Sequence, residues 1–156
     1  MFFLALSIVV PILVYALFPA FIQIATGKQF KRDGILLVAC VLYFISWQLP
    51  SPLIHGHNTS FTTHLIGGGV FTGLLWLSVK KQMNWKMTWL IEAMSLFACV
   101  CMLGVTNELF ELATVELHLT RLTGTDTWWD LFANTLGAFI FWIFYRIVLC
   151  VKRPSL

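Results

Sequence analysis

Residues 2–26 read FFLALSIVVPILVYALFPAFIQIAT, an apolar run without a charged side chain. A transmembrane helix needs about 20 consecutive, mostly apolar residues, so this run is long enough to cross a bilayer. No basic residue precedes it and no small-residue cleavage pattern ends it, which argues against a removable signal peptide. We therefore expect residues 2–26 to form a transmembrane helix of the folded protein.

The rest of the chain has the same apolar character. Of its 156 residues, 59% are hydrophobic and only 11% are charged, and the mean hydropathy is +0.85. Soluble domains carry roughly 25% charged residues, and a chain this short cannot bury so much apolar surface in its own core. The composition predicts an all-α integral membrane protein with a single transmembrane domain over residues 1–156. The dispersed net charge of +3 does not indicate a nucleic-acid partner.

Four further apolar runs follow the first one. The second is short and ends at Pro50-Ser51-Pro52, because proline cannot continue a helix. Short connections between the runs favour an antiparallel bundle of sequence neighbours. We expect a bundle of about five transmembrane helices, at about 2–26, 35–49, 61–79, 87–118 and 128–151.

Basic residues are concentrated on one side of this expected bundle. Only Arg121 lies on the opposite side from the other Lys and Arg residues, which follow the first, third and fifth spans: Lys28, Lys31, Arg32, Lys80, Lys81, Lys86, Arg146, Lys152 and Arg153. Cytoplasmic loops of membrane proteins are enriched in Lys and Arg. The distribution predicts an external amino terminus, a cytoplasmic carboxyl terminus and an odd number of spans.

Polar side chains gather near the external ends of the last three spans. Ionisable groups near hydrocarbon are costly unless they face each other or a wet cavity. One helical face is predicted to carry, at steps of four and three, Asn107, Glu111, Thr114, His118 and Arg121. A second face carries, at every fourth position, Asp126, Asp130 and Asn134. We expect both faces and His64 to meet in one external pocket.

This pocket would combine carboxylate, imidazole and amide groups. If the protein is an enzyme, the expected catalytic residues are His64, Glu111 and Asp130, with Glu111 or Asp130 as base or metal ligand. The expected substrate-binding residues are Asn107, Glu108, Asp126, Asn134 and Arg121. Such a donor set can hold a divalent metal ion, a phosphate bridged by that ion, or a proton-transfer pair. The sequence leaves the metal and the substrate open.

The same residues also have structural interpretations. Thr127 and Asp130 fit a helix capping box, and Asn134 can bond across to another helix. A solvated helix end accounts for His118 and Arg121, and an ordinary loop accounts for His55 and His57. Glu92, near the cytoplasmic end of its helix, is expected to pair with Lys86 in a structural role.

Small residues predict close contact between the third and fifth spans. Gly69 and Gly73 have the small-xxx-small spacing that lets helix backbones approach, and Ala133 and Gly137 repeat it. Such packing would bring His64 near Asp130.

The start of the fifth span resembles a known family signature. Residues 130–138, Asp-Leu-Phe-Ala-Asn-Thr-Leu-Gly-Ala, resemble the Asp, Asn and Gly pattern of VanZ-like membrane proteins. Thr63-His64-Leu65 and residues 107–111, Asn-Glu-Leu-Phe-Glu, are looser matches to the His-bearing and Glu-bearing segments of that family. The chain departs from the pattern at residues 60–63, which lack the usual acidic residue and Lys, and at Glu111, where many members have Gln.

The resemblance implies a small multi-pass protein of the bacterial cytoplasmic membrane. Some members of the family are linked to glycopeptide-antibiotic tolerance, but the family's poorly defined activity assigns no reaction. The leading hypothesis is an external acid–His pocket that binds or processes a polar lipid or a lipid-linked envelope precursor, as a hydrolase or transferase if it is catalytic. The alternative is a non-catalytic assembly or scaffold module whose polar residues only lock the helices together. A transporter is disfavoured, since the cytoplasmic half offers only Glu92 and no internal repeat is present.

Overall fold

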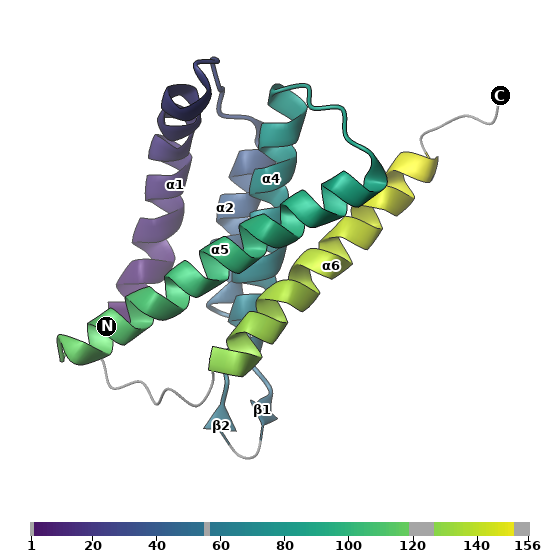
Figure 1. Ribbon diagram of the computed structural model, residues 1–156. Helices are drawn as coiled ribbons and strands as arrows, with labels where there is room; N and C mark the ends of the chain where they lie inside the picture. The colour runs from purple at the N-terminus through teal and green to yellow at the C-terminus, as the bar shows by residue number, and fades with distance from the viewer. Residues whose placement is uncertain (1, 55–56, 119–126, 152–156) are drawn as a thin grey trace.

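The computed structural model describes residues 2–54, 57–118 and 127–151, and most of them are helical (Figure 1). The long helices are α1 (Phe2–Thr26), α2 (Gly34–Ser46), α5 (Trp89–Glu116) and α6 (Thr127–Val151). Between α2 and α5 one continuous helix consists of α3 (Phe61–Thr63), the π-helical η1 (His64–Val70) and α4 (Phe71–Gln82). Two short strands, β1 (Leu53–Ile54) and β2 (His57–Asn58), pair antiparallel with Leu53 opposite Asn58.

The distribution of polar side chains is that of a membrane protein. Four helices are long and apolar enough to span a bilayer: α1, the continuous helix Phe61–Gln82, α5 and α6. Large apolar side chains such as Ile24 and Met102 lie on the outside. Polar side chains lie inside the bundle, and they include Ser7, Ser46, Ser78, Glu92, Asp130 and Asn134. This arrangement confirms the expected all-α membrane class, because in lipid the polar groups must be satisfied within the protein.

Helix α2 is the exception in length. Its 13 residues extend about 20 Å at 1.5 Å per residue, which is less than the roughly 30 Å hydrocarbon core of a bilayer. Helix α2 nevertheless packs between α1 and α4. Because α2 is shorter than the four candidate spans, the expected fifth membrane crossing stays a prediction.

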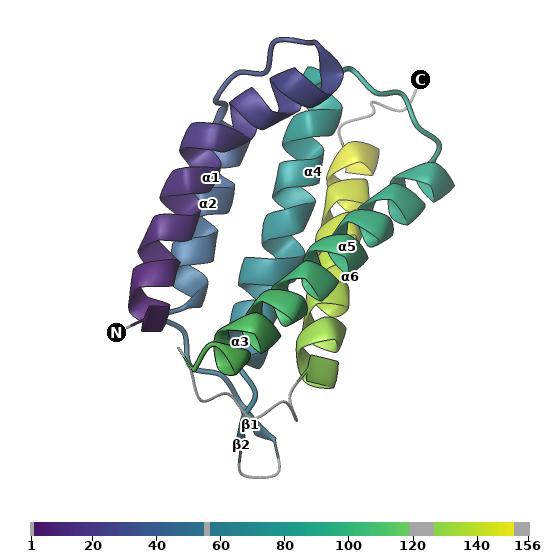
Figure 2. The ribbon, with the colours of Figure 1, turned by 60° about the vertical axis from the view of Figure 1, so that its left-hand side comes forward.

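Helix α1 is tied to the start of α2. Pro19 has no N–H to donate to the carbonyl of Tyr15, so the helix loses one of its own hydrogen bonds there. The Arg32 guanidinium donates to the carbonyl oxygens of Tyr15 and Ala16, at 3.1 Å in both cases. These contacts supply donors that the bilayer cannot, and α1 changes direction in its second half (Figure 2).

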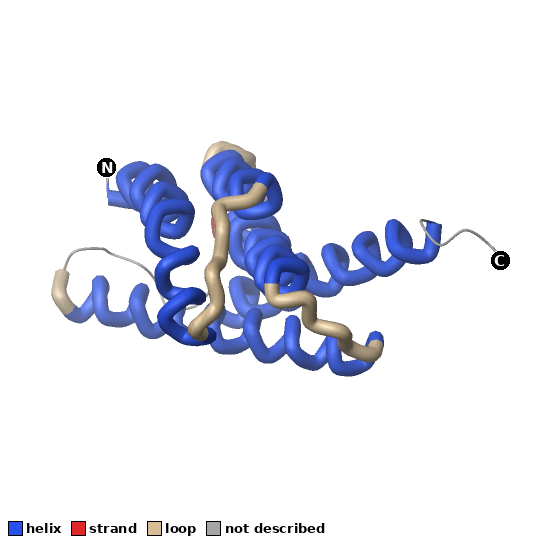
Figure 3. The backbone as a smooth tube through the Cα atoms, turned by 90° about the horizontal axis from the view of Figure 1, so that it is seen from above, coloured by secondary structure: helices blue, strands red, loops and turns tan. Residues whose placement is uncertain are grey.

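The two ends of the bundle differ in charge. We call the end with the α1–α2 and α4–α5 loops and the carboxyl end of α6 the basic end, because it carries Lys28, Lys31, Arg32, Lys80, Lys81, Lys86 and Arg146. The opposite end, with the β1–β2 strands, the end of α5 and the start of α6, is the hairpin end (Figure 1). Helix α5 crosses the bundle obliquely between them (Figure 3).

Two apolar cores fill the space between these ends. The first joins α1, α2 and α4 through residues such as Leu36, Ala39 and Leu75. The second lies between α4, α5 and α6 and contains Trp76, Leu96, Val100 and Ala138. Four of the five buried residues of α5 recur every four positions, as Glu92, Leu96, Val100 and Gly104. The second core therefore separates polar groups near the basic end from polar groups near the hairpin end.

The η1 segment packs almost backbone to backbone against α6. A Cβ added at Gly69 would lie 2.3 Å from the Asn134 carbonyl oxygen, and one at Gly137 would lie 2.0 Å from the Leu65 carbonyl oxygen. Only glycine permits this approach. The predicted close contact of the third and fifth spans is confirmed.

Several element bounds differ from the sequence expectation. Helix α5 begins at Trp89 and ends at Glu116 rather than near 118, because His118 has a left-handed backbone with φ of 57°. Helix α2 ends at Ser46, and the third helix continues to Gln82. The expected polar face of α5 therefore stops before His118, and Arg121 lies outside the described residues.

Candidate functional site

Three helices bring an imidazole and two carboxylates together near the hairpin end. His64 comes from η1, Glu108 from α5 and Asp130 from the first turn of α6. One ligand atom from each residue lies within 4.8 Å of the other two. His64 Nε2 is 3.4 Å from Asp130 Oδ1, which confirms the predicted approach of these two side chains. Asp130 is 1% exposed, and the other two are partly buried.

Asn134 lies one helical turn deeper than this trio. It is four residues after Asp130 on α6, while Gly68 follows His64 by four and Gly104 precedes Glu108 by four. A Cβ at Gly68 would lie 1.6 Å from Asn134 Oδ1, and a Cβ at Gly104 would lie 3.3 Å from Asn134 Nδ2. The two glycines therefore make room for the Asn134 amide directly beneath the three ligand atoms.

The Asn134 side chain is almost completely enclosed. It is 4% exposed, and its Oδ1 has no hydrogen-bond partner among the described residues. A buried amide oxygen without a partner is costly, and native structures contain few of them. We call His64, Glu108, Asp130 and Asn134 the hairpin-end cluster.

Glu111 does not join this cluster, although it was an expected catalytic residue. Its Oε1 accepts from Asn107 Nδ2 at 2.8 Å, its backbone carbonyl accepts from the Thr114 hydroxyl, and its carboxylate interacts electrostatically with Tyr43 of α2. Glu108, expected to bind substrate, takes the place beside His64 and Asp130.

The other candidate residues are placed less completely. Asp126, Arg121 and His55 lie outside the described residues, and only the backbone of His57 is described, in β2. His118 follows the end of α5. Helix α6 begins at Thr127, and the expected capping box of Thr127 with Asp130 stays a prediction.

Tryptophans mark the depth of the hairpin-end cluster. Trp128 is 81% exposed and Trp129 is 38% exposed, and both directly precede Asp130 on α6. Tryptophan is enriched at the boundary between headgroups and hydrocarbon. If these tryptophans lie at that boundary, Asp130 lies within one turn of it, because it follows Trp128 by two residues at 1.5 Å per residue.

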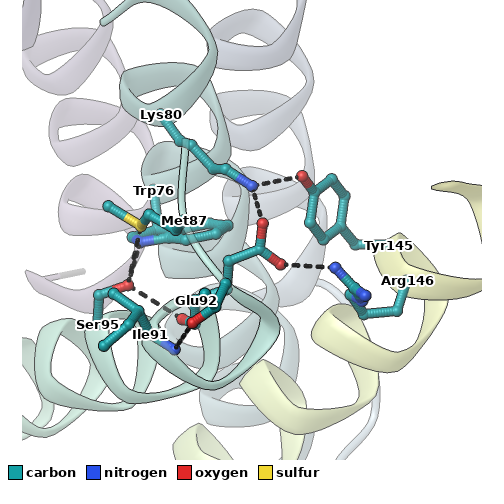
Figure 4. Close-up of polar contacts among 9 residues, drawn as sticks. Trp76, Lys80, Met87, Ile91, Glu92, Ser95, Tyr145 and Arg146 are labelled. Atoms are coloured by element: carbon teal, nitrogen blue, oxygen red, sulfur yellow. Dashed lines mark hydrogen bonds and ion pairs between the residues drawn. The ribbon is translucent and has the colours of Figure 1, made fainter. Parts of the chain in front are cut away.

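A second polar cluster occupies the same three helices near the basic end (Figure 4). Lys80 donates to Glu92 Oε1 and, at 2.8 Å, to the Tyr145 hydroxyl; Arg146 donates to Glu92 Oε2 at 3.1 Å. We call Lys80, Glu92, Tyr145 and Arg146 the basic-end cluster. The expected pairing of Glu92 with Lys86 is wrong: Lys86 lies exposed in the α4–α5 loop, while Lys80 and Arg146 reach Glu92 from the helices that flank it.

Sequence reasoning missed two features of the site. One is the π-helical segment that begins at His64 and contains Gly67, Gly68 and Gly69. Such segments often occur at functional sites. The other is the shared spacing of four that pairs His64 with Gly68, Glu108 with Gly104 and Asp130 with Asn134. That spacing is visible in the sequence once the three helices are aligned at one depth.

The hairpin-end cluster can bind groups of two kinds. Its carboxylates accept hydrogen bonds from hydroxyl or amine donors, and charge-assisted bonds of this type are the stronger ones. Together with the imidazole they can also hold a cation, which would in turn attract a phosphate. An acid–imidazole pair can also transfer a proton.

Comparison of the chain with protein-family models, curated proteins and solved structures finds no match. The resemblance to VanZ-like proteins is neither supported nor excluded by this result and stays a hypothesis based on residues 130–138 and the looser matches around them.

Proposed function

We propose that this protein is a VanZ-like cell-envelope membrane protein whose hairpin-end cluster binds or processes the polar headgroup of a lipid or of a lipid-linked envelope precursor. The observation that carries the proposal is the meeting of His64, Glu108 and Asp130 within one turn of the exposed Trp128. At this depth a headgroup can reach the cluster while its chains stay in hydrocarbon.

The proposal includes five membrane crossings, with the hairpin end outside and the basic end in the cytoplasm. The concentration of described Lys and Arg residues at the basic end supports this orientation. It would place the hairpin-end cluster in the outer leaflet, where envelope precursors are used. A bacterial cytoplasmic membrane is the matching location.

Lipid retention tests the proposal directly. The protein would be transferred from bacterial membranes into nanodiscs. Native mass spectrometry would release the protein from the nanodiscs and identify the polar lipids that stay bound to it. We expect a bound lipid on the wild type and its loss in His64→Ala and Asp130→Asn. We expect retention in Glu111→Gln, because Glu111 Oε1 accepts from Asn107 on the same helix and Glu111 is not one of the three residues whose ligand atoms converge.

The matched control is Tyr145→Phe, which removes one hydroxyl from the basic-end cluster and keeps the ring. It should retain the lipid. Equal retention by wild type, His64→Ala and Asp130→Asn would refute the proposal. A second readout is the susceptibility of a bacterium to a glycopeptide antibiotic. Expression of the wild type should change this susceptibility, and expression of Asp130→Asn should not.

A scaffold role is the second candidate, and the close packing of η1 against α6 favours it. On this alternative the hairpin-end cluster only holds the helices together. His64→Ala and Asp130→Asn would then lower the melting temperature in detergent and leave the bound lipids unchanged.

A further inference from the structure

We propose that the hairpin-end cluster is a binding site for one divalent transition-metal ion, with His64 Nε2, one carboxylate oxygen each of Glu108 and Asp130, and Asn134 Oδ1 as donors. The inference deepens the proposed function and rests on the same cluster. It is tested by metal content and not by lipid, so either proposal can fail alone.

The spacing of the ligand atoms fits a metal better than a direct hydrogen bond. N–H···O hydrogen bonds are usually about 2.7–3.2 Å long, and His64 Nε2 lies 3.4 Å from Asp130 Oδ1. Two donors at about 2.0–2.1 Å from a tetrahedral zinc ion are about 3.3 Å apart. One ligand atom each of His64, Glu108 and Asp130 lies within 4.8 Å of the other two. Small rotamer changes would bring all three atoms to one ion.

Asn134 supplies an independent indication. Its Oδ1 is enclosed, lacks a partner among the described residues, and lies beneath the trio in the space that Gly68 and Gly104 leave. An amide oxygen is a good ligand for a hard or borderline cation. A metal ion above Asn134 would satisfy this oxygen, which nothing else described in the structure does.

The donor set selects the class of ion. One imidazole with two carboxylates and an amide suits Zn²⁺ or Mn²⁺, since imidazole ligation is uncommon for Mg²⁺ and Ca²⁺. A divalent ion would also offset the charge of two carboxylates buried among helices. With the ion bound, the cluster would attract a phosphate or pyrophosphate headgroup, which narrows the proposed lipid to that class.

The test begins with elemental analysis of the full chain, purified in detergent through an affinity tag without histidine. We expect stoichiometric Zn or Mn on the wild type and on Tyr145→Phe. After removal of metal with a chelator, Zn²⁺ and Mn²⁺ would be titrated separately and the melting temperature followed. The wild type should gain several degrees with one of the ions, because ligands of the folded state raise its stability.

Variants identify the donors. We expect Asp130→Asn and His64→Ala to lose the bound metal and the rise in melting temperature, and Asn134→Ala to bind at least about 10-fold more weakly. Glu108→Gln, at a less buried position, gives a readout if Asp130→Asn does not fold. Wild-type protein with neither stoichiometric metal nor a shift with either ion would overturn the inference. So would equal metal content in wild type, Asp130→Asn, Glu108→Gln and His64→Ala. Metal without retained lipid would leave the inference standing and contradict the proposed function.

Discussion

The two buried polar clusters lie on the same three helical segments and are separated by one apolar core, yet they are constructed differently. In the basic-end cluster each Glu92 oxygen accepts from its own cation, Oε1 from Lys80 and Oε2 from Arg146. In the hairpin-end cluster His64 Nε2 lies 3.4 Å from Asp130 Oδ1, one ligand atom each of His64, Glu108 and Asp130 lies within 4.8 Å of the other two, and the Asn134 amide lies one turn further along α6. The first is a closed network of ion pairs, whereas the second contains a buried amide oxygen, Asn134 Oδ1, without a hydrogen-bond partner among the described residues.

This difference separates a structural role from a binding role. A closed network gains its energy within the protein, so removing one member leaves the others uncompensated. If the hairpin-end cluster holds the proposed metal ion, it gains its energy from that ion, so removing one ligand mainly weakens binding. The comparison predicts large stability effects at the basic end and small ones, with lost binding, at the hairpin end.

The largest effect is expected for Glu92→Ala. The change leaves the Lys80 ammonium inside the bundle, where its side chain is 11% exposed, and removes the partner of Arg146. Breaking a buried pair costs about 3–5 kcal/mol, and we expect the lower value because Arg146 is one-third exposed and can reach water. Thermal unfolding in detergent measures the loss.

Glu116→Ala is the matched control, since Glu116 is the exposed last residue of the same helix. It should leave the melting temperature unchanged. Equal melting temperatures for Glu92→Ala and wild type would show that the basic-end cluster does not stabilise the fold. The contrast between the two clusters would then be wrong.

Gly69→Ala should have the next largest effect. The added Cβ would meet the backbone of α6, at 2.3 Å from the Asn134 carbonyl oxygen and 2.7 Å from the Ala138 nitrogen. Backbone cannot rotate away, so the helices must separate at a cost of about 1–3 kcal/mol. Gly34→Ala, where nothing lies within 4 Å of the new Cβ, should cost nothing. Alanine has the higher helix propensity, so a lower melting temperature in Gly69→Ala can only come from packing, and an unchanged melting temperature in Gly69→Ala would contradict the close backbone contact.

Much of the fold could be predicted because the length of each apolar run is enough to identify a helix in a membrane protein. The runs beginning at residues 2 and 128 differ from α1 and α6 by at most one residue at their bounds. The end of α5 was misplaced, because the left-handed backbone of His118 comes from local chain geometry that helical periodicity does not encode.

The site was predicted only in part. Asp130 and His64 were found because small residues on two spans indicated close contact. Among the described residues, Glu108 rather than Glu111 lies with His64 and Asp130, and the spacing along α5 alone does not give the rotation of that helix toward its neighbours; the catalytic role expected for Glu111 stays a prediction. The partners of Glu92 were missed for a related reason: sequence distance favoured Lys86, whereas Lys80 and Arg146 come from neighbouring helices.

Gly68→Ala sharpens the comparison at the hairpin end. The new Cβ would lie 1.6 Å from Asn134 Oδ1, the end of a side chain, so Asn134 would turn aside while the backbones stay in place. We expect a stability loss of about 1 kcal/mol and a loss of metal binding similar to that of Asn134→Ala. Unchanged binding in Gly68→Ala would mean that the Asn134 amide takes no part in the cluster.

The smallest effect is expected for Lys86→Ala, and its value lies in the contrast with Lys80→Ala. Lys86 and Lys80 both belong to the basic end and both precede Glu92, and charge pattern alone does not distinguish them. Lys80 lies between the rings of Trp76 and Tyr145, at 5.3 and 5.0 Å from their centroids, and donates to Glu92, whereas Lys86 is exposed. Exposed substitutions rarely change stability, so Lys86→Ala should shift the melting temperature by less than about 1 °C while Lys80→Ala lowers it by several degrees. Equal shifts would mean that Glu92 is held by the general positive charge of the basic end and not by a closed network, and the basic-end cluster would lose the property that sets it apart from the hairpin-end cluster.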